Sequence, residues 1–356
     1  MKRKIAAAIA LAVAGSLLIT GCKGSGKQSK TDSGETLTVF NYGEYMDPEM
    51  VKLFEEETGI KVKYEEAVTP EEMYSKFSSG VIDYDLLCST DYMIGKLIEE
   101  DLIAPIDFSS FEYAENIGAD YWEFASAFDP ENQYVLPYFW GTIGILYDTT
   151  KVKEAPDSWQ VLFDGSYANQ IIMQDSMRDS FMVALKYLGY SVNTTDEKEI
   201  RKAYELLLSQ KKDVMSYLVD EARDEVVAGN AAMAVVYSGE AYLGHEYNPD
   251  LAYVVPKEGT NIWMDGWVMT KNCKNKEAAQ KFLDFLCRED VAAANFEYIY
   301  YSTPNQAVID GLDEELKKDP SIVPDTSKLK TSEVCVEAKK ETTELYNKLW
   351  KEIKAE

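Results

Sequence analysis

The pattern of apolar and polar positions in the first part of the folded chain predicts strands and helices in alternation. Residues 37–40, 60–64 and 84–88 are short apolar or alternating runs, which are typical of strands. Residues 47–59 begin with Asp-Pro, repeat apolar residues at helical spacing and end in glycine, whereas residues 69–80 begin with the capping box Thr-Pro-Glu-Glu. This order predicts an α/β fold with a parallel sheet.

A second series of the same kind begins near Gly141, and the length of the chain suits two domains. Because ligands of parallel sheets bind beyond the carboxyl ends of the strands, the loops after Phe40 and Cys88 are predicted to lie at a ligand site. In this second series, strands are predicted at 143–147, 171–173, 232–237 and 252–255, and helices at 180–188, 197–208, 276–287, 291–298 and 337–354.

The N-terminal residues have a pattern of their own. Three basic residues precede an apolar run over 5–19, which ends at Thr20-Gly21-Cys22. A basic head, a short apolar core and small residues are typical of a secretory signal, and the run is shorter than the roughly 20 residues that span a bilayer. We therefore expect residues 1–21 to be a signal peptide. Residues 22–36 are polar beyond the cysteine and predict a flexible tether.

The residues Ile-Thr-Gly-Cys that end this signal resemble the lipobox of bacterial lipoproteins. The resemblance implies a mature chain that starts at a diacylated Cys22 and is lipid-anchored to the cell membrane, in the periplasmic space or on the outer face. Two acyl chains hold a protein on a membrane far better than one. An ordinary secretory signal with a chance cysteine is the alternative.

The charge of the chain is strongly negative. Removing residues 1–21 takes away three of 36 basic residues and none of the 62 acidic ones, which leaves a net charge of −29. Such a surface repels nucleic acid, whose phosphates need basic partners, and attracts cations. We therefore expect no nucleic-acid partner, and the charge gives weak support for a cationic ligand.

Catalytic motifs are absent from the sequence. It has no GxSxG, HExxH or P-loop motif, and its one histidine, His245, lies in a polar stretch that predicts a surface position. Paired carboxylates could still serve glycoside chemistry, but we predict a protein that is not an enzyme and has neither metal nor cofactor. The four inner cysteines form no zinc-binding pattern, and free thiols are expected, with a disulfide as the alternative; they are Cys88, Cys273, Cys287 and Cys335.

Aromatic rings stand beside carboxylates at several predicted loops. A flexible aliphatic polycation needs both, because rings attract cations and cover methylene groups while carboxylates pair with amines. The alternative is that the rings fill the core with their polar atoms satisfied at its edge. The groups are 42–45, Asp91-Tyr92, 175–179, 237–240, 263–265 and 300–301.

Several sequence blocks match one family, and two of them, at 188–196 and 263–265, occur in an order specific to it. They include Leu-Gly-Tyr-Ser-Val-Asn-Thr-Thr-Asp at 188–196, Trp-Met-Asp at 263–265, Asn-Tyr-Gly-Glu-Tyr at 41–45 and Ser-Thr-Pro-Asn at 302–305. With them, the chain from Leu37 to its C-terminus resembles the spermidine/putrescine-binding proteins of bacterial polyamine ABC transporters.

That resemblance implies a two-lobed α/β fold of the type II periplasmic-binding-protein class, with the ligand in a cleft between the lobes. Lobe 1 would be 37–141 plus 264–309, and lobe 2 would be 142–263 plus 310–356. The implied partners are a small polyamine, namely spermidine or putrescine, and the subunits of an ABC permease. A protein of the same fold for an amino acid, a sugar or an iron chelate is the alternative.

The resemblance also implies the ligand-binding residues. Asp265 would grip one amine and Asp179 another, while Trp263, Tyr42 and Tyr237 would cover the methylenes. The family usually has tryptophan at position 42 and a hydroxyl residue at position 43, so the preference between spermidine and putrescine stays open. The other implied residues are Gly43, Tyr45, Thr90, Asp91, Tyr92, Asp175 or Ser176, Tyr301 and a late contact near Ser332 or Glu333.

Overall fold

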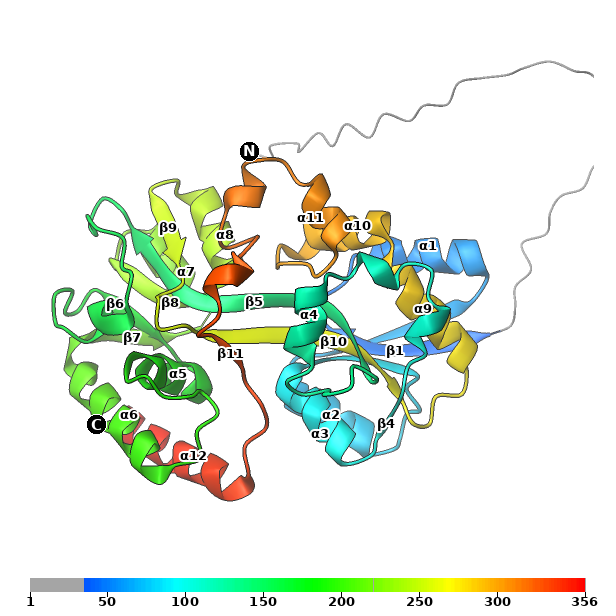
Figure 1. Ribbon diagram of the computed structural model, residues 1–356, viewed down its shortest axis with the longest axis horizontal. Helices are drawn as coiled ribbons and strands as arrows, with labels where there is room; N and C mark the ends of the chain where they lie inside the picture. The colour runs from blue at the N-terminus through cyan, green and yellow to red at the C-terminus, as the bar shows by residue number, and fades with distance from the viewer. Residues whose placement is uncertain (1–34, 220, 356) are drawn as a thin grey trace, which may run out of the picture. The chain divides into compact units, whose positions relative to one another are not determined.

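A computed structural model describes residues 35–219 and 221–355 (Figure 1). The predicted signal peptide at 1–21, the tether up to residue 34 and the lipidation site Cys22 lie outside the described residues. Within the described part of the chain, no helix is both long and apolar enough to cross a membrane.

The strands form a single mixed sheet with the order β2-β1-β3-β10-β5-β8-β6-β7, in which β4 and β11 also pair with β10, and β9 pairs with β5. The strands are β1 (Thr36–Tyr42), β2 (Lys61–Ala67), β3 (Leu86–Thr90), β4 (Ile103–Ala104), β5 (Val135–Asp148), β6 (Ile171–Gln174), β7 (Val214–Leu218), β8 (Met233–Tyr237), β9 (Leu251–Val254), β10 (Asn261–Thr270) and β11 (Glu333–Val334).

The helices cover both faces of this sheet. In Figure 1, α1, α9 and α10 lie on one side of β1, and α2 and α3 lie on the other side. The helices are α1 (Pro48–Thr58), α2 (Pro70–Ser78), α3 (Asp91–Glu99), α4 (Ala119–Ala125), α5 (Met177–Tyr187), α6 (Glu197–Gln210), α7 (Glu221–Val227), α8 (Ser238–Tyr247), α9 (Lys276–Cys287), α10 (Glu289–Ile299), α11 (Gln306–Gly311) and α12 (Lys340–Ala355).

Local sequence signals place most helix ends as predicted. Asp47 caps α1 by accepting from the backbone N–H of Glu49, and Gly59 ends the helix in the left-handed conformation. The helix predicted at 180–188 begins earlier, at Met177, because the side chain of Ser176 accepts from the backbone N–H of Asp179. Asp179 therefore lies in the first turn of α5.

The prediction of a parallel sheet is confirmed in part. Strands β1, β2 and β3 are parallel, and so are β6, β7 and β8. Strand β10 is antiparallel to both β3 and β5, and β5 is antiparallel to β8, so a fully parallel sheet is wrong. The strand–helix alternation could not show this, because β10 returns to β3 from a distant part of the chain.

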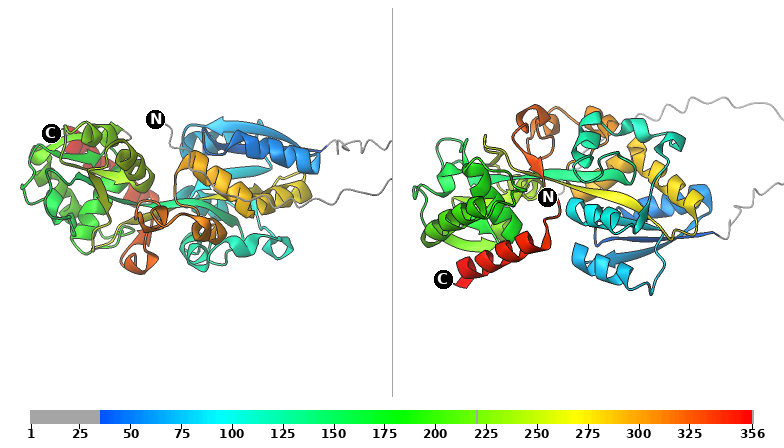
Figure 2. Two further views of the ribbon diagram at one scale, coloured as in Figure 1. Left: turned by 90° about the horizontal axis from the view of Figure 1, so that it is seen from above. Right: turned by 60° about the horizontal axis from the view of Figure 1, so that its bottom comes forward.

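Strands β5 and β10 connect the two parallel groups, and Figures 1 and 2 show them running through both. The sequence predicted a strand only at 143–147, whereas β5 extends over Val135–Asp148 and is buried along its whole length. A strand covered on both faces has a continuous apolar run rather than an alternating one. The segment 135–142 is such a run, with Pro137 within it.

The hydrophobic core is divided along β5. Its residues up to Trp140 pack in a first core with β1, β3 and α9, whereas Ile143, Ile145 and Tyr147 pack in a second core with β6, β8 and α5. A third, smaller core lies between β8, α7 and α8. The change of core at Gly141-Thr142 coincides with the predicted passage between lobes, although the limits 37–141 plus 264–309 and 142–263 plus 310–356 stay a prediction.

Candidate ligand-binding site

A cavity of about 430 Å³ lies beyond the carboxyl ends of β1, β3 and β8, where the topology predicted a ligand site. The starts of α3 and α5 and one face of β10 complete its wall. The lining residues are Tyr42, Tyr45, Pro70, Thr90, Asp91, Tyr92, Ser176, Arg178, Asp179, Tyr237, Asn261, Trp263, Asp265, Tyr301 and Cys335.

Asp265 is the best-placed carboxylate of this cavity. It lies on β10 opposite Thr90 of β3, and the hydroxyl of Tyr45 donates a hydrogen bond of 2.6 Å to its Oδ2. Burial raises the pKa of Asp265 to about 7, against the hydrogen bonds from Tyr45 and Thr90, and the charge of Asp91 adds to the rise. A nearby cation would reverse this shift.

Asp91 is a second carboxylate at the same end, and it is more deeply buried than Asp265. It is 3% exposed, and its oxygens accept from the backbone N–H groups of Tyr92 at 2.6 Å and Met264 at 3.3 Å. Burial raises the pKa of Asp91 to about 6, although the charge of Arg178 opposes the rise. Because both its oxygens already accept hydrogen bonds, Asp91 contributes negative charge to the cavity rather than a free hydrogen-bond acceptor for a ligand.

Asp179 provides a third carboxylate, from the first turn of α5. The hydroxyl of Tyr237 donates to its Oδ2 at 2.8 Å, and burial raises the pKa of Asp179. The Ser176 cap fixes the start of α5 and therefore the position of this side chain.

Aromatic rings separate these carboxylates. The centroid of the Trp263 ring lies 5.0 Å from the ring centroid of Tyr301 and 6.3 Å from that of Tyr237. The planes of both tyrosine rings are nearly perpendicular to the plane of the Trp263 ring. Two glycines make room for the rings: a Cβ would approach the Trp263 ring to 2.5 Å at Gly141 and the Tyr301 ring to 2.3 Å at Gly239. The cavity therefore depends on small residues in its floor.

Arg178 is a lining residue that the sequence reasoning missed. Its guanidinium lies 4.7 Å from the ring centroid of Tyr92, and its Nη2 donates to the carbonyl of Val336 at 2.9 Å. It lies in the segment 175–179, in which only Asp175 or Ser176 and Asp179 were predicted as site residues. The cavity thus contains a fixed cation of its own.

The structure brings most of the predicted site residues together. Three other lining residues, Pro70, Asn261 and Cys335, were not predicted. Asn261 could have been found from the sequence, because it alternates with Trp263 and Asp265. No sequence pattern indicated Pro70 or Cys335. The roles assigned to the predicted residues stay predictions. Those that line the cavity are Tyr42, Tyr45, Thr90, Asp91, Tyr92, Ser176, Asp179, Tyr237, Trp263, Asp265 and Tyr301.

Three predicted residues do not line the cavity. A Cβ at Gly43 would lie 3.8 Å from Oε2 of Glu66, and Asp175 accepts from Nζ of Lys354 at 2.8 Å on the surface. Of the two alternatives at the start of α5, Ser176 is the lining residue. Glu333 points to a polar network instead of the cavity.

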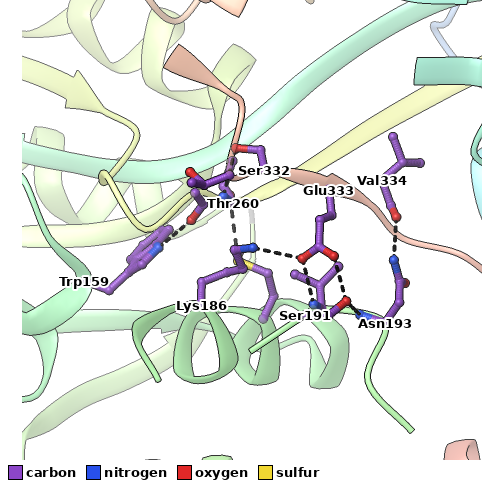
Figure 3. A network of polar contacts seen from close by, with 12 residues as sticks. Trp159, Lys186, Ser191, Asn193, Thr260, Ser332, Glu333 and Val334 are labelled. Carbon is purple, nitrogen blue, oxygen red and sulfur yellow. Dashed lines mark hydrogen bonds and ion pairs between the residues drawn. The ribbon is translucent and has the colours of Figure 1, made fainter. Parts of the chain in front are cut away.

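That network holds the segment 332–336 against the start of β10 and the loop after α5 (Figure 3). The carboxylate of Glu333 accepts from Nζ of Lys186 at 2.9 Å, Oγ of Ser191 at 2.7 Å and the backbone N–H of Val192 at 3.1 Å. Burial works to raise the pKa of Glu333, but these three donors outweigh it and hold the pKa below its usual range.

The same segment is held along its backbone. The amide of Asn193 donates to the carbonyl of Val334 and accepts from the N–H of Val336, each at 2.9 Å. The backbone N–H of Thr260 donates to Oγ of Ser332 at 3.1 Å (Figure 3). These contacts position Cys335, the lining residue between them.

Replacing Glu333 by alanine is expected to lower the free energy of unfolding by about 2–4 kcal/mol, because the buried Lys186 loses its counter-charge. Since the pKa of Glu333 is lowered in the folded protein, this stabilisation is present above its unfolded pKa and is lost as the pH falls through the lowered value. Urea unfolding of the variant measures the loss. Glu337→Ala, at an exposed position four residues on, is the matched control, and equal stability of the two variants would contradict the role of the network.

The remaining chemistry of the described residues is sparse. Among residues 35–219 and 221–355, no group of three or more His, Cys, Asp or Glu side chains is arranged to hold a metal ion. Within the same ranges the cysteines are buried free thiols, and burial raises the pKa of Cys335 to about 12. His245 is exposed on α8, as predicted.

Comparison with known proteins defines the class of this chain. A sequence profile of the family described as bacterial extracellular solute-binding protein matches residues 49–324. The chain is 36% identical over 304 residues to the spermidine/putrescine-binding periplasmic protein of Salmonella typhimurium, covering 84% of this chain and 86% of that protein. To the protein of the same name from Escherichia coli it is 35% identical over 307 residues, 85% and 87% of the two chains.

A solved structure agrees with these relatives. The spermidine/putrescine ABC transporter substrate-binding protein PotD of Streptococcus pneumoniae matches with a TM-score of 0.84 and 38% identity, over 90% of this chain and 99% of that one. This chain therefore belongs to the bacterial extracellular solute-binding proteins, in the group that contains the spermidine/putrescine-binding proteins. The predicted two-lobed periplasmic-binding-protein fold is confirmed.

Proposed function

We propose that this protein binds a polyamine outside the cytoplasm and delivers it to an ABC permease, without catalysing a reaction. The observation that carries the proposal is one cavity with two carboxylates, the half-buried Asp265 and the buried Asp179, and the ring of Trp263 in the same wall. Relatives named for spermidine and putrescine support the assignment.

The magnitudes suit a ligand with several ammonium groups. A carboxylate about 4 Å from an ammonium contributes on the order of 4 kcal/mol at an effective dielectric near 20, before desolvation. Each ring contact with a cation adds about 0.5–2 kcal/mol. The summed contribution of two such ion pairs and their ring contacts is larger than the binding free energy of roughly 8 kcal/mol that corresponds to micromolar affinity. The difference is available to offset the cost of ordering the ligand.

Ligand binding would stabilise a closed arrangement of the lobes, and the closed form would dock on the permease. Helix α3 packs in the first hydrophobic core and α5 in the second, and the contact between Tyr92 and Arg178 joins their starts. A polyamine held between Asp265 of β10 and Asp179 of α5 would add a stronger connection of the same kind. Co-purification with permease subunits in the presence of polyamine tests this step.

Calorimetry with spermidine, putrescine, a neutral sugar and an amino acid tests the ligand class. Saturable binding of a polyamine is expected, with no measurable heat from the sugar or the amino acid. The bound polyamine should be recovered chemically unchanged. Binding of a neutral sugar without binding of polyamines would overturn the assignment and favour another ligand on the same fold.

The membrane anchor is proposed from the lipobox-like residues that end at Cys22. Replacing Cys22 by serine is expected to move nearly all of the protein from the membrane fraction to the soluble fraction, because the two acyl chains cannot be attached and each buried methylene is worth about 0.8 kcal/mol. Fractionation and mass spectrometry of the N-terminus measure the change. Ser25→Ala, three residues on, is the control, and a Cys22→Ser protein that stays in the membrane fraction would contradict the anchor.

A further inference from the structure

Arg178 is the one cationic side chain among the cavity-lining residues that the structure describes. It is half-buried and lies in the first turn of α5, one residue before Asp179. Its surroundings are those expected of a bound ammonium group: its guanidinium lies 4.7 Å from the ring centroid of Tyr92, and its Nη2 donates to the carbonyl of Val336 at 2.9 Å. The protein therefore places a cation of its own in a wall of rings and carboxylates.

The aromatic partner of this cation is itself held in place. The hydroxyl of Tyr92 donates to Oε1 of Glu71 at 2.9 Å, and its backbone N–H donates to Oδ1 of Asp91 at 2.6 Å. The tyrosine is thus fixed at its hydroxyl and at its backbone, by residues of α2 and α3. Because Arg178 has one contact with this fixed ring and another with the backbone of the segment 332–336, its charge is a fixed feature of the cavity wall.

Asp91 is the carboxylate that this cation compensates. Burial raises the pKa of Asp91, and the charge of Arg178 opposes that rise more strongly than any hydrogen bond to the carboxylate does. Burial also raises the pKa of Asp179, but there the hydrogen bonds from Ser176 and Tyr237 oppose the rise more strongly than the charge of Arg178 does. Both oxygens of Asp91 also accept from backbone N–H groups. The charge of Asp91 is therefore balanced mainly within the protein, whereas that of Asp179 is left for a ligand.

Two carboxylates of the cavity remain for a ligand. They are Asp265 on β10 and Asp179 on α5, and each accepts a hydrogen bond from a tyrosine hydroxyl. When the carboxyl groups are ionised, three negative charges and the positive charge of Arg178 give the lining side chains a net charge of −2. A ligand with two ammonium groups cancels this charge. A third ammonium group in the cavity would have no counter-charge left and would be repelled by Arg178, which makes its desolvation unfavourable.

We propose that Arg178 is a specificity-determining residue that takes the place of a third ligand ammonium group, so that the cavity prefers a linear diamine to a triamine. This inference rests on the proposed polyamine function and names the ligand class within it. Arg178 acts through its charge, because it compensates Asp91 and repels an ammonium group that enters beside Tyr92. Asp265 and Asp179 hold the two ammonium groups of the diamine.

Calorimetry of the wild-type protein and Arg178→Gln with the diamine putrescine and the triamine spermidine tests the inference, at a pH above the raised pKa values of Asp265 and Asp91. The wild type is expected to bind putrescine more tightly than spermidine. Glutamine keeps an N–H donor but removes the charge, so the ratio of spermidine to putrescine affinity should increase about tenfold, the effect of one unit charge about 12 Å from an additional ammonium at an effective dielectric near 20. Tighter binding of spermidine by the wild type, or an unchanged ratio in the variant, would overturn the role of Arg178.

Two control variants separate charge from structure. Arg178→Lys keeps the charge but not the planar guanidinium, so it should keep the affinity ratio of the wild type. Arg201→Gln removes the same charge from an exposed position of α6, where Arg201 pairs with Glu197, and is the matched control. Its ratio should be unchanged, because salt screens exposed charges. A ratio shifted toward spermidine in either control would count against the inference.

A further variant guards against a folding defect in Arg178→Gln. Ser176→Asp adds a carboxylate to the wall while Arg178 stays, and the start of α5 is kept because aspartate caps a helix as well as serine does. The affinity ratio should again shift toward spermidine, and an unchanged ratio would overturn the inference. If the wild-type protein binds neither amine, the proposed function fails and this inference fails with it. If the wild type binds both and the ratios do not follow the charge of the wall, only the role of Arg178 is lost.

Discussion

Replacing Asp265 by asparagine is expected to weaken polyamine binding by about 150- to 5,000-fold, since the loss of one partner from a buried ion pair costs about 3–5 kcal/mol. Asparagine keeps the shape of the side chain and can still accept from the hydroxyl of Tyr45, which lies 2.6 Å from Oδ2 of Asp265. The fold should therefore remain. Calorimetry measures the affinity, and thermal unfolding without ligand checks the structure.

Asp175→Asn is the matched control for this variant. Asp175 was also a predicted site residue, but the structure places it on the surface with Lys354 and outside the cavity. Its replacement should change polyamine affinity by less than about twofold, because exposed ion pairs contribute about 0–1 kcal/mol even to their own stability. Unchanged affinity in Asp265→Asn, or an equal loss in both variants, would remove Asp265 from its assigned role.

Polyamine affinity is expected to increase with pH up to about pH 8. Burial raises the pKa of Asp265 to about 7 and that of Asp91 to about 6, so below these values the free cavity carries protons that an ammonium ligand must displace. Affinity should fall by about tenfold per pH unit below pH 7 through Asp265 and by a further tenfold per unit below pH 6 through Asp91, which amounts to about 1,000-fold at pH 5. Titrations in buffers of different ionisation enthalpy should show proton release near pH 6.5, about midway between the two raised values.

The same groups make the opposite contribution to the stability of the ligand-free protein. A carboxyl whose pKa is raised by folding binds its proton more tightly in the folded than in the unfolded state, so this contribution decreases as the pH rises from about 4 to about 7. Asp265→Asn should flatten both profiles. A spermidine affinity that is independent of pH in the wild type between about pH 5 and about pH 8 would show that Asp265 is already ionised in the free protein.

Local signals were sufficient for individual elements and for part of the site. The Asp47 cap and Gly59 define α1, and the loops at the ends of β1 and β3 were placed at the ligand site by topology alone. Local signals failed where the environment on both sides of a segment decides its structure. Strand β5 has no alternation because both of its faces are covered, and β10 pairs with strands that lie far away in the sequence.

The assignment of Glu333 shows the limit for side chains. The family resemblance implied a late contact with the ligand near Ser332 or Glu333, but in the structure the Glu333 carboxylate is engaged by Lys186, Ser191 and Val192. Arg178 was missed in the opposite way: it was not predicted as a site residue, because a site for a cationic ligand is not expected to contain a cation, yet it lines the cavity. Neither orientation can be inferred from spacing, since each depends on partners from other elements.

The sequence by itself determined the class of the protein, the alternation of strands and helices and the residue types of the site, because capping, periodicity and motif order are local properties of the chain. The tertiary structure alone decided which of those residues share a cavity and that Asn261 joins them. It also decided how far burial shifts the carboxyl pKa values. The physical reason is that desolvation and hydrogen-bond satisfaction depend on what packs around a group, and its neighbours in space come from distant parts of the chain.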